Sequence, residues 1–375
     1  MTADSIKLGI FAPDRERCGI SDYVRQLNQE IGQLDGLSII RTMSPPHGNS
    51  KDDERRLLAT QYKSAAQDVS GPPVDLVHVH HEYSLFGGIA PHRSRSRAFF
   101  SGLSTPAVMT VHEIAQDQRS PVRQRLIELA NRLSLVHRQV RVYVVHTETD
   151  RHRLIRLGVA DKDIRLIRLA TPDPEPLPPS HEAHERIGAY GRRVITLFGF
   201  LAAKKGHYDA ITALSMLPED VLLVFAGDIH PSDGSGYVRA LREYIRASPL
   251  RDRIRITGFL SADDLIWHLA ATDVAIAPYH TSSGSASVAR LMSAGLPVVA
   301  TSIPVFEDIL KSEPGSILLT NQRNALDLAS KITMVLADAE LRGSLIEHSL
   351  LFARANSFNS VARSMRTIYS EALNK

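Results

Sequence analysis

The chain has 375 residues, 43% of them hydrophobic, and a formal net charge of +3, which fits a globular protein and does not indicate a nucleic-acid partner. One hydrophobic core rarely serves a chain of this length, so we expect two domains. No apolar run reaches the roughly 18 residues of a membrane-spanning helix, and the single cysteine, Cys18, excludes an internal disulfide framework and a multi-cysteine metal site. The first residues lack the charged-then-apolar pattern of a signal peptide, so we expect a cytoplasmic protein.

Short apolar runs alternate with helical stretches in the first half of the chain. The predicted strands are Ile6–Phe11, Leu37–Thr42, Val74–His80, Ala107–His112, Val142–His146 and Arg165–Leu169. Helices are predicted at Ser21–Leu34, with Ser21 as the N-cap, and at Val122–Val136. The segment Thr171–Ser180 is rich in proline, which breaks helices and fixes an extended backbone, so we predict a linker there.

A second alternating series follows this segment. The predicted strands are Val194–Phe198, Val221–Ala226, Ile254–Thr257 and Val274–Pro278, and the predicted helices are His207–Leu217, Gly236–Ala247 and Ser261–Ala271. Repeated strand–helix–strand units favour parallel sheets covered on both faces. We therefore predict an α/β protein with two doubly wound, Rossmann-like domains, residues 1–175 and 181–354, that face each other across a cleft. Such sheets bind ligands at the carboxyl ends of their strands, so the cleft is the expected site.

The stretch Tyr279–Thr301 is the most informative one in the chain. It is predicted to form a strand end, a turn of small residues, a short helix that ends at Gly295, and a buried strand. Because the turn Thr281–Ser285 has no bulky side chain, another molecule can approach its backbone closely. A helix N-terminus carries unpaired N–H groups and a partial positive charge, so this stretch suits a phosphate. It also fits an ordinary loop–helix–strand unit of an α/β domain.

Basic residues outnumber acidic ones between Arg93 and Arg168. Such a region can contact anionic lipid headgroups or an anionic acceptor, and a solvated basic surface is the alternative interpretation. Three histidines, His78, His80 and His81, lie near one predicted strand end. No second cluster has the spacing of metal ligands, so we expect no metal site.

Seven short motifs follow one another along the chain. Each motif alone is weak evidence for a family, but their order and spacing together are strong evidence. They are Cys18–Tyr23, Val77–Tyr83 with Phe86–Gly88, Thr110–Glu113, Gly199–Gly206, Phe225–Asp228, Ile256–Leu260 and Ala294–Ala300. Over essentially its whole length the chain resembles the retaining glycosyltransferases of family four, which have the GT-B fold. The resemblance implies that the final predicted helix, Ser357–Asn374, returns to the first domain, which thereby regains about residues 355–375.

The chain also departs from the family pattern. The family carries two glutamates eight positions apart, and these fall on Ser282 and Arg290; a family arginine that holds the donor diphosphate falls on Phe200. Arg290 has no acceptor atoms and cannot replace a carboxylate. The chain therefore resembles a divergent member that lacks the paired glutamates.

The resemblance implies a set of site residues. His112 is expected to contact the transferred sugar, and Lys205 to stabilise the charge that grows on the β-phosphate of the leaving nucleotide. The expected donor-binding residues are Gly19, Phe200, Phe259, Leu260, Ser282, Ser283, Gly284, Ser285 and Arg290. The expected acceptor-binding residues are Asp22 and Glu82.

The implied function is a retaining hexosyltransferase that uses a GDP- or UDP-sugar and a saccharide or lipid-linked saccharide acceptor, in bacterial surface polysaccharide or glycoconjugate synthesis. No metal and no cofactor are expected, and peripheral contact with an anionic membrane at its inner face fits the basic region. A non-catalytic nucleotide-sugar-binding homologue is one alternative, motivated by the missing glutamates. A GT-B epimerase or hydrolase is another. A NAD oxidoreductase is disfavoured because no Gly-x-Gly-x-x-Gly follows the first strand.

Overall fold

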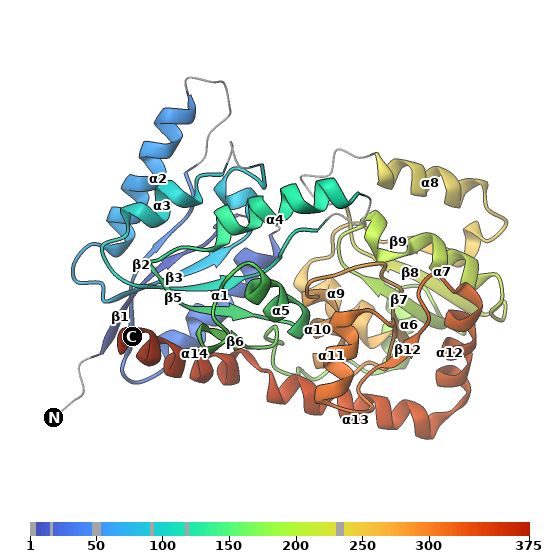
Figure 1. The fold of residues 1–375 in the computed structure, drawn as a ribbon. Helices are drawn as coiled ribbons and strands as arrows, with labels where there is room; N and C mark the ends of the chain where they lie inside the picture. Colours follow the sequence, from blue (N-terminus) through green and yellow to red (C-terminus); the bar gives the residue numbers. More distant parts are fainter. Residues whose placement is uncertain (1–4, 16–17, 47–53, 91–93, 117–119, 230–235) are drawn as a thin grey trace. The chain divides into compact units, whose positions relative to one another are not determined.

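The computed structural model describes residues 5–15, 18–46, 54–90, 94–116, 120–229 and 236–375. The chain divides into two compact units (Figure 1). Unit 1 comprises Met1–Arg168 and Phe358–Lys375, and unit 2 comprises Leu169–Ser357. Within the described residues, no helix combines the length and the apolarity that crossing a bilayer requires.

Unit 1 contains one parallel sheet with the strand order β2-β1-β3-β4-β5-β6. Its strands are β1 (Ile6–Phe11), β2 (Leu37–Met43), β3 (Leu76–His81), β4 (Ala107–Val111), β5 (Val140–Val145) and β6 (Ile164–Leu166). All six residues of β3 are buried, because helices cover both faces of the sheet. The order reverses between β1 and β3, so the carboxyl ends of these two strands mark the expected ligand position of this sheet.

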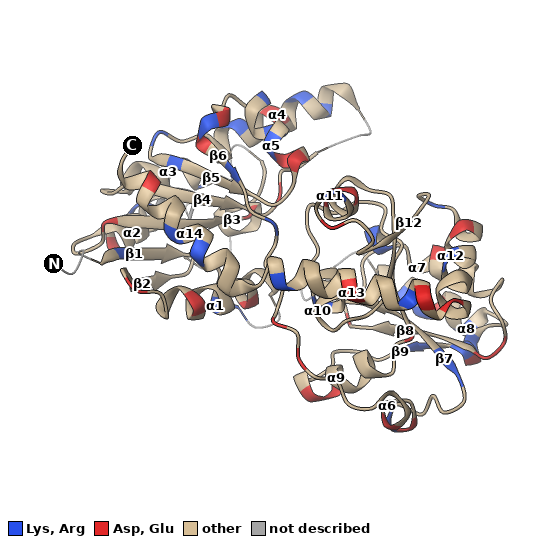
Figure 2. Ribbon diagram, turned by 90° about the horizontal axis from the view of Figure 1, so that it is seen from below, with Lys and Arg blue, Asp and Glu red and all other residues tan. Residues whose placement is uncertain are grey.

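The helices of unit 1 lie on both faces of its sheet. They are α1 (Gly19–Gly32), α2 (Glu54–Ser70), α3 (Ser96–Gly102), α4 (Pro121–Leu135), α5 (Glu148–Arg156) and α14 (Phe358–Leu373), with short 3-10 turns at Tyr83–Phe86 and Asp161–Asp163. Helices α1 and α14 pack against each other on one face, and α2 and α3 lie on the other (Figures 1 and 2). A hydrogen bond from Asn359 to Glu30 (3.0 Å) and one between the Tyr369 hydroxyl and Nδ1 of His78 (2.8 Å) fix α14 to this unit.

Unit 2 contains a second parallel sheet with the order β12-β11-β10-β7-β8-β9. Its strands are β7 (Arg193–Phe198), β8 (Val221–Ala226), β9 (Ile254–Ile256), β10 (Val274–Ala277), β11 (Val298–Thr301) and β12 (Leu318–Thr320). This order reverses between β7 and β10, which are neighbours in the sheet. The predicted fold class, α/β with two Rossmann-like domains, is thus confirmed.

The helices of unit 2 also cover both faces of a sheet. They are α6 (Ser180–Arg186), α7 (His207–Leu214), α8 (Tyr237–Ala247), α9 (Ala262–Ala270), α10 (Ala286–Ser293), α11 (Pro304–Ser312), α12 (Ala325–Ala337) and α13 (Ala339–Ala355), with 3-10 turns at Ala203–Lys205 and Arg251–Arg253. Helices α7, α8 and α12 pack on one face, and α9, α10 and α11 on the other. The Pro-rich segment that the sequence suggested as a linker belongs to unit 2, where Thr171 bridges to Ser357.

One predicted cap is wrong. Helix α1 begins at Gly19, and its N-cap position is Cys18, which makes no capping hydrogen bond with its side chain. Ser21, predicted as the cap, lies inside the helix, is buried, and accepts a hydrogen bond from the backbone N–H of Arg15 (3.1 Å). The N-cap therefore lies three residues earlier than predicted, at Cys18, whose backbone is extended as is usual at this position.

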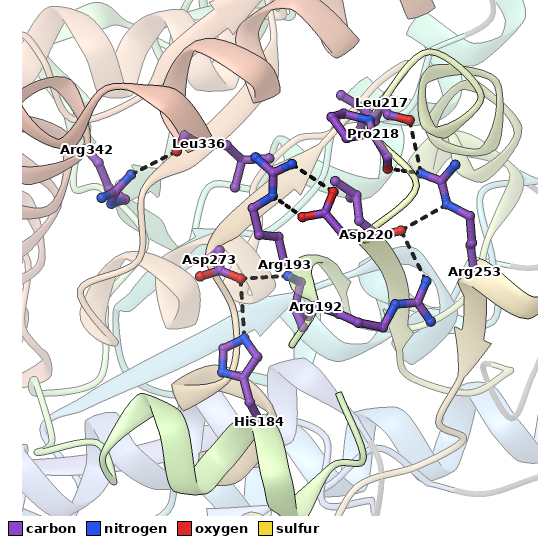
Figure 3. Close-up of polar contacts among 12 residues, drawn as sticks. His184, Arg192, Arg193, Leu217, Pro218, Asp220, Arg253, Asp273, Leu336 and Arg342 are labelled. Atoms are coloured by element: carbon purple, nitrogen blue, oxygen red, sulfur yellow. Dashed lines mark hydrogen bonds and ion pairs between the residues drawn. The ribbon is translucent and has the colours of Figure 1, made fainter. Parts of the chain in front are cut away.

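Arginine and aspartate side chains hold the amino edge of the unit 2 sheet (Figure 3). Arg193, at the start of β7, donates two hydrogen bonds to Asp220, which precedes β8 (2.7 and 2.8 Å). Asp273, which precedes β10, accepts from a backbone N–H of β7 (2.6 Å) and lies 3.4 Å from a ring nitrogen of His184. The hydrogen bonds from Arg193 lower the pKa of Asp220, although its own partial desolvation opposes this. The side chains of Arg193, Asp220 and Asp273 thus have partners within this edge, which lies at the end of the sheet opposite the expected ligand position.

Candidate functional site

The candidate site of unit 2 lies where two loops leave the sheet at its switch point. Residues 199–206 follow β7, and residues 278–285 follow β10. Because the strand order reverses between these strands, the helices that follow them lie on opposite faces, and their loops diverge at the carboxyl edge. Backbone hydrogen bonding still ties the loops together, since the N–H of His280 donates to the carbonyl of Lys204 (2.8 Å).

Lys205 is half-buried in this loop pair and is surrounded by neutral oxygens. Its ammonium donates to the hydroxyl of Tyr279 (3.1 Å), to the hydroxyl of Ser287 (3.2 Å) and to the carbonyl of Phe198 (3.3 Å). The ammonium also lies 4.9 Å from the centre of the Tyr279 ring. Within the part of the chain that the structure describes, no carboxylate lies within 4 Å of it. The cation is therefore positioned without a counter-charge.

Three glycines allow this close packing. A Cβ on Gly199, which has φ +111°, would lie 2.2 Å from the Ser287 hydroxyl and 2.6 Å from the Lys205 ammonium. A Cβ on Gly227, directly after β8, would lie 2.1 Å from the Gly199 carbonyl oxygen. A Cβ on Gly206, which has φ +72°, would lie 1.9 Å from the carbonyl oxygen of Pro278. Any larger residue at these positions would displace the lysine or the loops around it.

The turn of small residues ends at the N-terminus of α10, as the sequence predicts. Ser285 caps the helix by accepting a hydrogen bond from the N–H of Val288 (3.2 Å). The Ser282 hydroxyl bonds to Gly284, donating to its carbonyl (2.5 Å) and accepting from its N–H (3.4 Å). Ser287, in the first turn of α10, contacts Lys205, so the helix N-terminus and the ammonium meet at one place. Both carry positive charge, which together suits a phosphate.

The other expected donor-binding residues of unit 2 lie on the loop after β7, on the loop after β9 and on α10. Phe200 is half-buried and Phe259 is 56% exposed, while Leu260 packs on a small apolar cluster that includes Leu222 and Val224. Arg290, on α10, pairs with Glu175 of the Pro-rich segment (3.1 Å). That ion pair is partly exposed, so it is a weak one that an anionic ligand can displace.

In unit 1, His112 follows β4 at the carboxyl edge and belongs to a group of neighbouring histidine rings. Its Nε2 lies 3.1 Å from Nδ1 of His80, and its ring lies 5.3 Å from the ring of His146. Tyr23 of α1 covers all three rings at 5.5 to 6.1 Å. Below them, His78 bonds to Tyr369 of α14 (2.8 Å). Burial, followed by the neighbouring histidines, lowers the pKa of His112 and His80 well below 6.5, so both rings are neutral at neutral pH.

A neutral His112 held at Nε2 by another histidine has a fixed ring orientation. Among the described residues, the hydrogen bond of this ring is the one at Nε2. Nδ1 is thus the ring nitrogen that can meet a sugar hydroxyl.

The remaining expected residues of unit 1 make local contacts. Gly19 opens α1, and a Cβ there would meet nothing within 4 Å, so its glycine is not required by packing. Asp22 forms an exposed ion pair with Arg25 (2.5 Å). The carboxylate of Glu82 caps the 3-10 turn after β3, accepting from the N–H of Ser84 (3.1 Å). Among the described residues there is no group of three or more His, Cys, Asp or Glu that could hold a metal ion.

Sequence reasoning missed the residues that position Lys205. Ser287 and Tyr279 both lie within the stretch singled out as informative, but only the rotation of α10 and the bend at Gly199 show that they reach the ammonium. Asp209 and His280 were also missed. Their 2.6 Å contact joins the start of α7 to the loop after β10 and so fixes the loop on the far side of Lys205.

Family models match both halves of the chain. The model described as Glycosyltransferase Family 4 matches residues 26–171, and the model described as Glycosyl transferases group 1 matches residues 181–350. The chain is 26% identical over 195 residues to the alpha-D-kanosaminyltransferase of Streptomyces kanamyceticus, covering 51% of this chain and 48% of that one. It is 27% identical over 255 residues to the 2-deoxystreptamine N-acetyl-D-glucosaminyltransferase of Streptomyces fradiae, covering 65% of this chain and 59% of that one. The chain thus spans about half the length of the relatives that it matches in sequence.

Solved structures show the same fold over the whole chain. HepE from Anabaena, solved in complex with UDP-glucose, superimposes with a TM-score of 0.76 at 16% identity, over 97% of this chain and 99% of that one. At this identity the likeness concerns the fold. Both halves of the chain thus match glycosyltransferase family models, and the fold is that of the solved GT-B structures.

Proposed function

We propose that the chain is a retaining hexosyltransferase that moves a hexose from a nucleotide diphosphate sugar to a saccharide or lipid-linked saccharide, in bacterial surface polysaccharide or glycoconjugate synthesis. The two family matches support transfer of a sugar. HepE was solved with UDP-glucose, which supports a UDP-linked donor here; a GDP-linked hexose is the second candidate.

One observation carries the proposal: Lys205 is a half-buried ammonium with three neutral acceptors, beside the N-terminus of α10 and without a carboxylate partner among the described residues. A positive charge held in place by protein oxygens favours an anion as its partner. The position is the carboxyl edge of a parallel sheet at its switch point, where phosphates of nucleotides commonly bind. A diphosphate fits because the ammonium and the amides of α10 offer two adjacent sets of donors.

The proposed chemistry breaks the bond between C1 of the sugar and the β-phosphate oxygen. Negative charge then grows on the β-phosphate, where Lys205 and the first N–H groups of α10 stabilise it. The acceptor hydroxyl attacks C1 from the side that the phosphate leaves, and its proton passes to the departing phosphate oxygen. The products are a glycoside with the donor's anomeric configuration and a nucleoside diphosphate. No carboxylate occurs between Tyr279 and Ser293, so the leaving phosphate serves as the base.

The remaining assignments extend this proposal. We assign the base and ribose to Phe200, Phe259 and Leu260, and the diphosphate to Lys205 with residues Ser282, Ser283, Gly284, Ser285 and Arg290, with Gly19 as a further backbone donor. In unit 1, His112 contacts the transferred sugar, and Asp22 and Glu82 contact the acceptor. The proposal needs no metal ion, because the lysine and the helix N-terminus supply the positive charge.

The test compares Lys205→Ala with Lys204→Ala, a neighbouring exposed lysine. Binding of UDP, GDP and their hexose conjugates is measured by calorimetry and by the rise in melting temperature that a bound ligand causes. Loss of one charge-assisted hydrogen bond should weaken diphosphate binding about tenfold or more in Lys205→Ala and leave Lys204→Ala unchanged. Equal affinities in both variants would remove Lys205 from the site.

Turnover is followed separately by proton NMR of the donor with candidate saccharide acceptors. A new glycoside with the donor's anomeric configuration supports the proposal, and an inverted configuration contradicts retention. Tight donor binding without consumption of donor indicates a non-catalytic homologue. Release of free sugar or of an epimerised donor would indicate the hydrolase or epimerase alternative.

A further inference from the structure

Glu175 is a carboxylate of unit 2 whose position is set by the backbone around it. It belongs to the Pro-rich segment and lies between Pro174 and Pro176. The ring of Pro174 fixes φ just before the glutamate, and a residue that precedes a proline is restricted to an extended backbone. The backbone of Glu175 therefore has few alternative conformations.

Two anchors hold this segment on unit 2. The N–H of Thr171 donates to the carbonyl of Asn356 (2.9 Å), and the Thr171 hydroxyl donates to the carbonyl of Ala353 (2.6 Å). On the other side of Glu175, Leu177 packs against two apolar clusters of unit 2. The side chain of Glu175 is 55% exposed between these anchors. The segment thus holds a carboxylate at the surface of unit 2, where a ligand can compete with it.

The partner of Glu175 lies on the same side of α10 as the contact with Lys205. Helix α10 buries its other side in unit 2, at Val288, Ala289, Leu291, Met292 and Ser293. Ser287 and Arg290 are both half-buried and lie three residues apart, so they are neighbours on the helix surface. Ser287 contacts the Lys205 ammonium, and the Arg290 guanidinium donates to Glu175 (3.1 Å). The arginine that binds Glu175 thus starts less than one helical turn from the place where Lys205 meets α10.

The charge of the bound nucleotide changes during the proposed reaction. In the donor, the terminal phosphate is esterified by the sugar and carries one negative charge. In the nucleoside diphosphate that leaves, this phosphate has a free second acid group with a pKa of about 6, so at neutral pH it gains most of a further charge. A carboxylate held beside the phosphates therefore repels the product more strongly than the donor.

We propose that Glu175 competes with the terminal phosphate of the nucleoside diphosphate for Arg290, and that it thereby promotes release of this product. The ion pair between Glu175 and Arg290 opens when the donor binds and forms again as the product leaves. This inference rests on the proposed function, because it needs the diphosphate at Lys205 and Arg290. Partly exposed ion pairs are weak, so Glu175 shifts the balance between product and donor without blocking either.

The test measures the affinity of the full chain for UDP and UDP-glucose, and for GDP and GDP-mannose, by calorimetry. Glu175→Gln removes the competing charge and keeps the size of the side chain. We expect the nucleoside diphosphate to bind about three- to fivefold more tightly in this variant, and the nucleotide sugar less than about twofold more tightly. A residue that only supports its segment would not tighten the product selectively. The gain should be smaller in an Arg290→Gln background and should fall as salt rises.

Asp173→Asn is the matched control, because Asp173 is another exposed carboxylate of the Pro-rich segment. It should leave the affinities unchanged, and all variants should keep the wild-type melting temperature. The proposal is overturned if Glu175→Gln leaves product affinity unchanged or lowers it, or if Asp173→Asn gives an equal gain. Absence of UDP and GDP binding in the wild type would overturn it together with the proposed function. Loss of binding in Lys205→Ala, with wild-type affinities in Glu175→Gln, would overturn this inference alone.

Discussion

Acid should unfold unit 1 at a pH at which unit 2 stays folded. Six histidines of unit 1 have pKa values lowered chiefly by burial: His78, His80, His81, His112, His137 and His146. A histidine with a lower pKa in the fold than in the unfolded chain gives its full stability above pH 6.5, and loses it as the pH falls from 6.5 toward the folded pKa. The unfolded chain then binds protons that the folded unit does not.

The size of the effect follows from two fully buried rings. The pKa values of His78 and His81 are lowered from 6.5 to about 3. Between pH 6.5 and pH 5 each of these two histidines therefore lowers the free energy of unfolding of unit 1 by about 2 kcal/mol, since the loss is about 1.4 kcal/mol per pH unit. The other four histidines also lower the stability of unit 1 as the pH falls. The total free energy of unfolding of a domain is only about 5–15 kcal/mol. In unit 2, the pKa of His207 is lowered to about 3, so the same change in pH lowers the free energy of unfolding of unit 2 by about 2 kcal/mol.

The single tryptophan separates the two units in one experiment. Trp267 lies on α9 of unit 2, with the Arg186 guanidinium 4.8 Å from its ring centre. Urea unfolding at pH 7.5 and pH 5 is followed by tryptophan fluorescence, which reports unit 2, and by far-ultraviolet circular dichroism, which reports both units. At pH 5 we expect an early dichroism transition that the fluorescence does not follow.

Coincident transitions at both pH values would refute this reasoning. A pair of variants sharpens the test. His81→Asn removes a buried histidine ring, and the control His181→Asn removes a histidine whose side chain is 81% exposed. The stability difference of unit 1 between the two pH values should shrink by about 2 kcal/mol in the first variant and stay constant in the second.

Three further outcomes are expected. Tyr369→Phe leaves a nitrogen of buried His78 without its partner and should lower the stability of unit 1 by about 1–3 kcal/mol in urea unfolding, whereas Tyr190→Phe, at a site 84% exposed, should not. Gly199→Ala should abolish the rise in melting temperature on adding a nucleotide diphosphate sugar, because the new methyl group displaces the neighbouring ammonium; an unchanged rise would show that the ammonium is not needed. Arg193→Met removes an ion pair at the amino edge (Figure 3) and should cost at most about 1 kcal/mol while donor affinity in calorimetry stays the same.

The sequence predicted the strands better than the helix boundaries. The bounds of Ile6–Phe11 and Val221–Ala226 agree at every residue, since a buried parallel strand is a continuous apolar run with sharp ends. Helix α2, Glu54–Ser70, is not among the predicted elements, because its polar and apolar residues alternate without a clear stripe. Ser21 suited an N-cap by type alone, and its actual partner, Arg15, lies six residues away on the other side of the loop.

For the candidate site, the sequence motifs indicated which loops form the site, but they did not indicate which side chains touch one another. The turn Thr281–Ser285 follows from its small residues and Lys205 from the resemblance, and the structure puts the lysine beside the helix that the turn begins. The role of Ser287 depends on which way α10 is rotated, and the stacked rings around His112 depend on strand register. Both are set by packing between segments far apart in the chain, which no local pattern records.

The position of α14 has a consequence for how the chain folds as it is made. The ribosome completes Arg168 long before Phe358, and the intervening 169–357 take roughly 10–40 s at ~5–20 residues per second. During that interval the face that carries His78 has no tyrosine from α14 to cover it. Unit 2 can therefore finish folding before α14 packs on unit 1, and the apolar face of unit 1 that α14 covers stays exposed to water during that interval.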